Sequence, residues 1–258
     1  MLKAFYLLLI TACLFLQACT THTDESDKSS IKKPNLGKAA AYNVQLGLGY
    51  LKQGDRPRAK KKLLTALEQE PKSPDVNSAM AYYFEQTNEL DQAEKYYLKA
   101  LSLTTNGGAQ LNNYGAFLCR QEEYQKAEQY FLKAVNDLQY VNTAAAYENA
   151  GLCALSVPNN EKAKLYFTKA INQDPSRKDS FYELVKLEVK GGHDADAFAL
   201  MQKHPDLVLD DRVLLSLAQE VSEKVGQHDV AVAYGNNLKK IDPNLDNGGE
   251  NNEYNNHA

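Results

Sequence analysis

The sequence contains no tryptophan, only three methionines and four cysteines among 258 residues, and its five histidines are scattered. Because zinc sites need cysteine and histidine ligands at short spacings, this scatter argues against a metal centre. A glycine-rich phosphate loop and a Gly-x-Ser-x-Gly motif are also missing, and acidic pairs such as Glu122 with Glu123 are typical of solvated helix ends. We therefore expect a protein that is not an enzyme, with no cofactor, no metal and no small-molecule substrate.

An excess of positive charge is likewise absent, since 29 lysines and arginines face 33 acidic residues and the formal net charge is -4. Duplex binding depends on a basic face, so we expect no nucleic-acid partner. The strongest local positive feature is Arg56, Arg58, Lys60, Lys61 and Lys62. Two interpretations stay open for residues 56–62: a solvated outer helix face, or a surface attracted to anionic lipid headgroups or to an acidic partner.

The sequence has no apolar run long enough to cross a membrane. The uncharged run 4–18 has 15 residues, whereas a membrane-spanning helix needs about 20. Its length is typical of a cleaved secretory signal. The junction Leu16-Gln17-Ala18-Cys19 resembles the bacterial lipobox, although Gln17 departs from the usual small residue. This resemblance implies a signal peptide over 1–18 and fatty acyl chains such as palmitate on Cys19; an ordinary signal peptide or a short anchor is the alternative.

The residue after the cysteine is Thr20. In bacterial lipoproteins an aspartate at this place signals retention at the inner membrane, so its absence implies an outer-membrane lipid anchor on the periplasmic face. Residues 19–39 are mostly polar, and we expect a lipidated N-terminus followed by a disordered tether. After Pro243 the composition turns to Asn, Asp and Gly, so residues 244–258 are expected to be a disordered tail.

A repeat of about 34 residues occupies the rest of the chain. Alanines recur at separations of 34, 34, 36, 34 and 34 residues: Ala59, Ala93, Ala127, Ala163, Ala197 and Ala231. Twelve residues before the first four of them stands a small residue: Gly47, Ala81, Gly115 and Gly151. Four residues after the same alanines come large side chains, which we expect to fill the gaps between units: Leu63, Tyr97, Phe131 and Phe167.

This pattern resembles the tetratricopeptide repeat, whose unit is a pair of antiparallel helices. The resemblance implies an all-α fold, a right-handed superhelical solenoid of about six αα-hairpins over residues 40–243. The expected units start near residues 40, 74, 108, 144, 178 and 212. Units five and six place Val185 and Gln219 at the glycine position, and Gly235 stands where a large residue is expected, so they are interpreted as degenerate or capping repeats. Two extra residues within 136–142 lengthen a second helix or its exit loop.

In the tetratricopeptide family, the first helices of the units line a concave surface. The corresponding residues here are Ala41, Val44, Leu48, Leu51, Tyr82, Gln86, Asn112, Ala116 and Leu152. In unit one this face is apolar apart from Lys52, which is typical of a docking site for a partner segment. The alternative is that the tether or a preceding helix covers it.

Cys119 and Cys153 are the two cysteines expected in the mature chain. The repeat register places them on the first helices of adjacent units, so a disulfide is geometrically plausible. By closing a 34-residue loop it would stabilise the fold by about 3 to 4 kcal/mol. Two separately buried thiols are the alternative.

The lipobox, the tether, the six units and the run from Leu111 to Cys119, LNNYGAFLC, together resemble the type IV pilus biogenesis and stability lipoproteins, the PilF/PilW group. The resemblance implies a pilotin, which binds the outer-membrane secretin and promotes its localisation and multimerisation. Paired cysteines in units three and four also occur in this family, which favours the disulfide. The alternative is a tetratricopeptide lipoprotein scaffold of another envelope machine, for outer-membrane protein assembly or cell-wall turnover.

Overall fold

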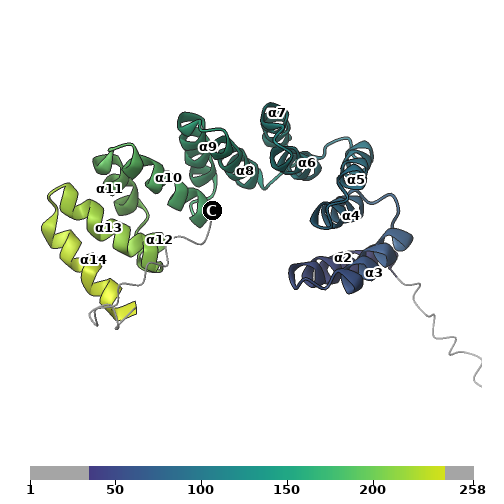
Figure 1. Ribbon diagram of the computed structural model, residues 1–258, viewed down its shortest axis with the longest axis horizontal. Coiled ribbons are helices and arrows are strands. Elements are labelled where there is room, and N and C mark those ends of the chain that lie inside the picture. Colours follow the sequence, from purple (N-terminus) through teal and green to yellow (C-terminus); the bar gives the residue numbers. More distant parts are fainter. Residues whose placement is uncertain (1–34, 242–258) are drawn as a thin grey trace, which may run out of the picture. The chain divides into compact units, whose positions relative to one another are not determined.

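The computed structural model describes residues 35–241, and its regular elements are helices (Figure 1). Among the helices of this range, none combines the length and the apolar character that a membrane span requires. The expected signal peptide 1–18, the lipidation site Cys19 and the tail 244–258 lie outside the described residues.

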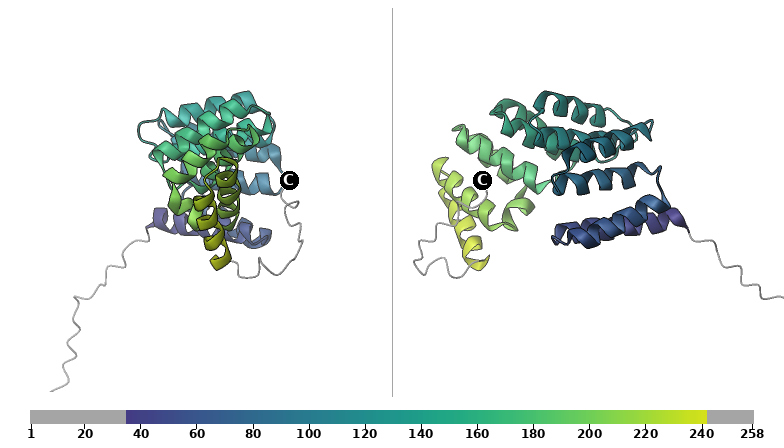
Figure 2. Two further views of the ribbon diagram at one scale, coloured as in Figure 1. Left: turned by 90° about the vertical axis from the view of Figure 1, so that its left-hand side faces the viewer. Right: turned by 45° about the vertical axis from the view of Figure 1, so that its right-hand side comes forward.

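The described helices form six hairpins that follow one another in chain order, as two further views also show (Figure 2). Hairpins one to three are α2 (Leu36–Lys52) with α3 (Arg56–Gln69), α4 (Pro74–Gln86) with α5 (Leu90–Ser102), and α6 (Gly108–Arg120) with α7 (Tyr124–Val135). Hairpins four to six are α8 (Thr143–Ser156) with α9 (Asn160–Gln173), α10 (Lys178–Lys190) with α11 (Asp194–Lys203), and α13 (Arg212–Lys224) with α14 (His228–Ile241). The short helix α12 (Pro205–Leu209) joins the last two hairpins.

Side-chain caps explain where several of these helices begin. The Ser73 hydroxyl accepts a hydrogen bond from the Val76 amide at the start of α4, and Asp211 accepts from Val213 and Leu214 at the start of α13. The Asn159 side chain likewise accepts from the Lys162 amide at the start of α9. These bonds satisfy backbone amides that have no partner inside the helix.

The small residues of the repeat allow the two helices of a hairpin to approach closely. A Cβ atom added at Gly115 would lie 2.9 Å from ring atoms of Phe131, and one at Gly151 would lie 2.6 Å from Phe167 Cε1. The large side chains therefore pack inside their own hairpins, whereas the sequence suggested that they fill gaps between units. Tyr97 does both, because its ring centroid is also 5.1 Å from that of Phe117 in the next hairpin.

The structure changes two details of the expected organisation and decides between two alternatives for a third. Residues 36–39 were expected in the tether but belong to α2, because the alanine-rich start of this segment favours a helix. The two extra residues lie in a loop, since α7 ends at Val135 and the Asp137 carboxylate accepts hydrogen bonds from the Gly108 and Gln139 amides. In hairpin five Pro205 ends the second helix early, because proline lacks an amide hydrogen, and α12 then buries Val208 in the core.

Candidate partner-binding groove

The first helices of hairpins one to four line a groove with a volume of about 860 Å³. Its lining comprises Val44, Leu48, Leu51, Lys52, Asp75, Ser78, Ala79, Tyr82, Gln86, Tyr97, Asn113, Ala116, Arg120 and Asn149. Apart from Tyr97 of α5, these residues come from α2, α4, α6 and α8. Consecutive first helices thus contribute to one continuous surface.

The end of the groove at hairpin one is apolar apart from Lys52. Val44, Leu48 and Leu51 follow one another at spacings of four and three residues, which places them on one face of α2. They are half-buried, because they pack against the core and still border the groove. Tyr82 of α4 continues this apolar surface and is exposed.

A charged network forms the middle of the groove. Arg120 of α6 binds the Glu85 carboxylate through two nitrogens, with Nη2 at 2.9 Å from Oε2, and the Tyr97 hydroxyl donates to the same oxygen at 2.9 Å. The Glu85 side chain is only 6% exposed, so the carboxylate depends on these partners. Burial and the adjacent Glu85 raise the pKa of Tyr97. Although partial burial opposes it, bonding to Glu85 raises the pKa of Arg120.

Asparagines occupy the far end. Asn113 and Asn149 both line the groove and stand at the same position of consecutive repeats, 36 residues apart. The Asn149 amide donates to Asn112 Oδ1 at 3.0 Å, which ties hairpin four to hairpin three. Amide side chains of this kind can donate to and accept from the backbone of a bound segment.

Six of the nine residues predicted for the groove line it: Val44, Leu48, Leu51, Tyr82, Gln86 and Ala116. Asn112 is buried and faces Asn149, so it supports the stack; its neighbour Asn113 borders the groove. Ala41 and Leu152 are exposed but lie outside the lining. Asp75, Ala79, Tyr97, Asn113 and Asn149 were missed, and for the two asparagines their shared repeat position was the available signal.

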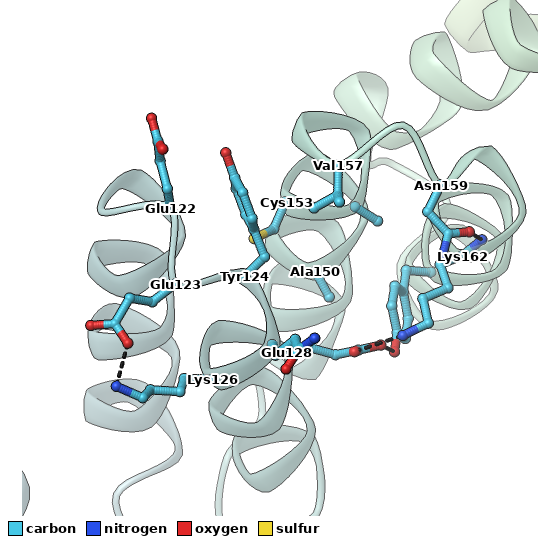
Figure 3. Close-up of a pocket in the computed structure, with 13 residues that line it drawn as sticks. Glu122, Glu123, Tyr124, Lys126, Glu128, Ala150, Cys153, Val157, Asn159 and Lys162 are labelled. Atoms are coloured by element: carbon cyan, nitrogen blue, oxygen red, sulfur yellow. Dashed lines mark hydrogen bonds and ion pairs between the residues drawn. The ribbon is translucent and has the colours of Figure 1, made fainter.

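The two cysteines of hairpins three and four are joined. Cys119 of α6 and Cys153 of α8 form a disulfide with a Cα–Cα distance of 5.9 Å. Cys153 also borders a second pocket of about 500 Å³ (Figure 3). This pocket was not predicted, and Figure 3 shows Lys126 pointing to Glu123 on one side and Lys162 pointing to Glu128 on the other. Its carboxylates are therefore largely neutralised by neighbouring lysines.

The basic stretch 56–62 lies on α3. Arg56, Lys60 and Lys61 are exposed, while Lys62 is half-buried. Arg58 bonds to Asp55 and lies 4.7 Å from the centroid of the Tyr50 ring. Across residues 35–241, no three His, Cys, Asp or Glu side chains come together in a way that could hold a metal ion.

Repeated antiparallel helix pairs with a small residue at the crossing point define a tetratricopeptide protein. The family model described as tetratricopeptide repeat matches residues 44–109. The fold is that of a tetratricopeptide solenoid, which confirms the fold predicted from the sequence.

Similar proteins specify the class further. The chain is 32% identical over 233 residues to the type IV pilus assembly protein PilF of Pseudomonas aeruginosa, covering 88% of this chain and 90% of that protein. A solved structure of Pseudomonas aeruginosa PilF is 31% identical, with a TM-score of 0.63 over 81% of this chain and 95% of that one. PilW, described as a widely conserved type IV pilus biogenesis factor, is 25% identical, with a TM-score of 0.60 over 79% and 94% of the two chains.

The chain therefore belongs to the PilF/PilW family of tetratricopeptide proteins of type IV pilus biogenesis. The family resemblance predicted from the sequence is confirmed. Tetratricopeptide scaffolds of this kind typically bind other proteins and are not enzymes.

Proposed function

We propose that the protein is an outer-membrane lipoprotein that acts as a pilotin: it binds the type IV pilus secretin and promotes its localisation and multimerisation. Family membership supports a role in pilus biogenesis. The observation that carries the finer proposal is the groove, which is apolar at hairpin one apart from Lys52 and polar at hairpins three and four. Such a surface suits a polypeptide segment with one apolar and one polar part.

The groove can hold such a segment by two different means. Apolar side chains of the secretin would be removed from water against Leu48, Leu51 and Tyr82, which supplies most of the affinity. Gln86, Asn113 and Asn149 would bond to the polar part and fix its direction. Arg120 is held in place by its bonds to Glu85, which compensate its charge, so it would contribute N–H donors to the segment.

The proposed lipid anchor contributes through confinement. More than one acyl chain on Cys19 gives stable membrane attachment, whereas a single chain is marginal. Confinement to one membrane raises the effective concentration of the secretin segments that the groove captures. Shielding these apolar segments would keep secretin subunits from aggregating until the multimer inserts.

Substitution of an apolar groove residue tests the groove. We expect Leu48→Asp or Leu51→Asp to weaken secretin binding about tenfold or more, because a charge replaces a buried apolar contact. Leu98→Asp is the matched control, since Leu98 of α5 is exposed and lies outside the groove. Binding is measured with purified secretin, and circular dichroism verifies that each variant is folded. Equal binding by Leu48→Asp and the control would show that the groove is not the secretin site.

A separate experiment tests the anchor. Metabolic labelling with palmitate should mark the wild-type protein and not Cys19→Ala. The variant should be released from the outer membrane, and assembled secretin multimers should decrease there. Labelling of Cys19→Ala at the wild-type level, or its retention in the outer membrane, would contradict the anchor without affecting the groove proposal.

A further inference from the structure

Inside the array, each hairpin covers one face of the next. Repeat positions three, seven and ten, counted from residues 74, 108 and 144, are buried on the first helices of hairpins two to four: Val76, Met80, Tyr83, Gln110, Tyr114, Phe117, Ala146, Ala150 and Cys153. Contacts with the preceding hairpin explain this burial where they are seen directly. Tyr114 and Phe117 lie against the Tyr97 ring, and Gln110 donates to Asp75 at 2.8 Å.

The same positions are open in hairpin one. Counted from residue 40 they are Tyr42, Leu46 and Gly49. Tyr42 is 67% exposed and Leu46 is 47% exposed, and a Cβ atom added at Gly49 would meet no atom within 4 Å. Hairpin one therefore exposes the surface that its successors use to stack on another helix. Val44 and Leu48 of the groove lie on a different side of α2, so this face is separate from the groove.

The stacking surfaces inside the array also match charges. Glu128 of α7 accepts hydrogen bonds from Lys162, at 2.7 Å, and from Tyr166 of hairpin four. Glu94 of α5 accepts from the Tyr114 hydroxyl at 3.0 Å. In hairpin one, the residues at the repeat positions of Lys162 and Tyr166 are Arg58 and Lys62. The face that binds a carboxylate in hairpin four thus carries two cationic side chains in hairpin one, of which Arg58 is already bonded to Asp55.

We propose that the end face of hairpin one, formed by Tyr42, Leu46, Gly49, Arg58 and Lys62, binds an amphipathic helix of a partner protein. This helix carries a carboxylate beside its apolar side chains and packs on α2 and α3 as α7 packs on hairpin four. The absence of a side chain at Gly49 lets the helix approach closely. Lys62 pairs with its carboxylate, and Arg58, held by Asp55, lies at the matching position of Lys162. The inference adds a second binding surface to the groove and does not depend on the identity of the groove's occupant.

Two other occupants fit less well. In a second copy stacked head to tail, α14 would take the place of α7, but its residue at the position of Glu128 is Val232, so Lys62 would meet an apolar side chain where hairpin four meets a carboxylate. The chain's own residues 20–34 contain one large apolar side chain, Ile31, which is too little to cover Tyr42 and Leu46.

A helix of this protein's own sequence serves as the probe. A fluorescent peptide of residues 123–137, which spans α7, is titrated with the full chain and followed by fluorescence anisotropy. We expect binding that Leu46→Glu weakens about tenfold or more, because one leucine contact is lost and a like charge is introduced. Lys62→Glu should weaken binding as well, and a peptide with Glu128→Lys should restore binding to that variant. Leu98→Glu is the control and should bind normally.

Every other outcome overturns the proposal. Absence of peptide binding, or binding that Leu46→Glu leaves unchanged, would show that the end face does not take such a helix. If the peptide does not bind but vesicles of phosphatidylglycerol retain the wild-type chain more than the Leu46→Glu chain, the face contacts a membrane. Self-association in sedimentation velocity that Leu46→Glu abolishes would assign the face to a second copy. Lys62→Glu changes a surface charge, so it keeps the test valid if Leu46→Glu unfolds.

Discussion

In hairpins one, three and four the first helix supplies a glycine and the second a large side chain, as when Gly115 packs against Phe131. Hairpin six reverses this order, because Gly235 lies on the second helix and the Gln219 side chain of the first lies 3.2 Å from the place of its missing Cβ. Hairpin five has neither, and fully buries Val185 and Met201 instead. The two regions, hairpins one to four and hairpins five and six, therefore fill the helix crossing with different residue pairs.

The two regions also differ in how the hairpins are tied together. Hairpins one to four share one hydrophobic cluster and contain the disulfide, whereas the helices from α9 to α14 share a second cluster. The second region adds α12, whose Val208 is fully buried, after the early end of α11. Hairpins one to four thus form the groove, whereas in the last two hairpins the short helix α12 fills the core after the early end of α11.

The largest expected effect comes from removing the large buried side chain on the second helix of one of hairpins one to four. Phe131→Ala should lower the free energy of unfolding by about 4 kcal/mol, since it removes a buried ring and leaves a cavity beside Gly115. Urea unfolding followed by circular dichroism measures the loss. A loss below about 1 kcal/mol would mean that the hairpin closes around the cavity. Hairpin three would then need a large side chain at this position no more than hairpin six, which has Gly235 there.

Removing the disulfide should come next. The Cys119→Ala/Cys153→Ala double variant should lose about 3 to 4 kcal/mol, because the cross-link closes 34 residues of chain in the unfolded state. Hydrogen exchange should accelerate in α6 to α9 and remain unchanged in α13 and α14. Equal acceleration in both regions would show that the array unfolds as one unit.

The same substitution in the two regions should have effects of different size. Gly151→Ala should destabilise by about 2 kcal/mol, because the new methyl group would overlap the rigid Phe167 ring. Gly235→Ala should change stability by less than about 1 kcal/mol in either direction, since Gln219 can move and alanine favours the helix. Thermal unfolding of both variants measures the difference. Equal losses would contradict the reversed packing of hairpin six.

The smallest expected effect is an alkaline sensitivity of the regular region. Burial, together with Glu94 for Tyr114 and Glu128 for Tyr166, raises the pKa of both hydroxyls. Above a pH of about 10 the unfolded chain loses these protons while the folded chain keeps them, so stability falls as the pH rises, by less than the limit of about 1.4 kcal/mol per pH unit for each tyrosine because solvent screens part of each shift. Tyr166→Phe should remove one such contribution from the slope. Tyr182→Phe in hairpin five, where Lys186 lies over the ring, is the control. An unchanged slope in Tyr166→Phe would contradict the assignment.

Much of the groove could be predicted, because repeat positions convert directly into positions on a helix face. Val44, Leu48 and Tyr82 were found in this way. Asn112 was misplaced because neighbouring residues on a helix point about 100° apart, and only the packing of α6 against α8 showed that Asn113 borders the groove. The pocket beside Cys153 has no sequence signal, because its residues come from three different helices and the loops before them.

The spacing of alanines and glycines by itself determined that the chain folds into helical hairpins of 34 residues, since backbone contact at a helix crossing tolerates only small side chains. Proline and capping residues marked many of the helix ends. Only the tertiary structure decided that Gln219 and Gly235 exchange roles and that Tyr42 and Leu46 stay exposed in hairpin one. The packing of Gln219 against Gly235 and the exposure of Tyr42 and Leu46 both depend on which side chains lie opposite them in space. The position of a residue in the sequence does not specify those side chains.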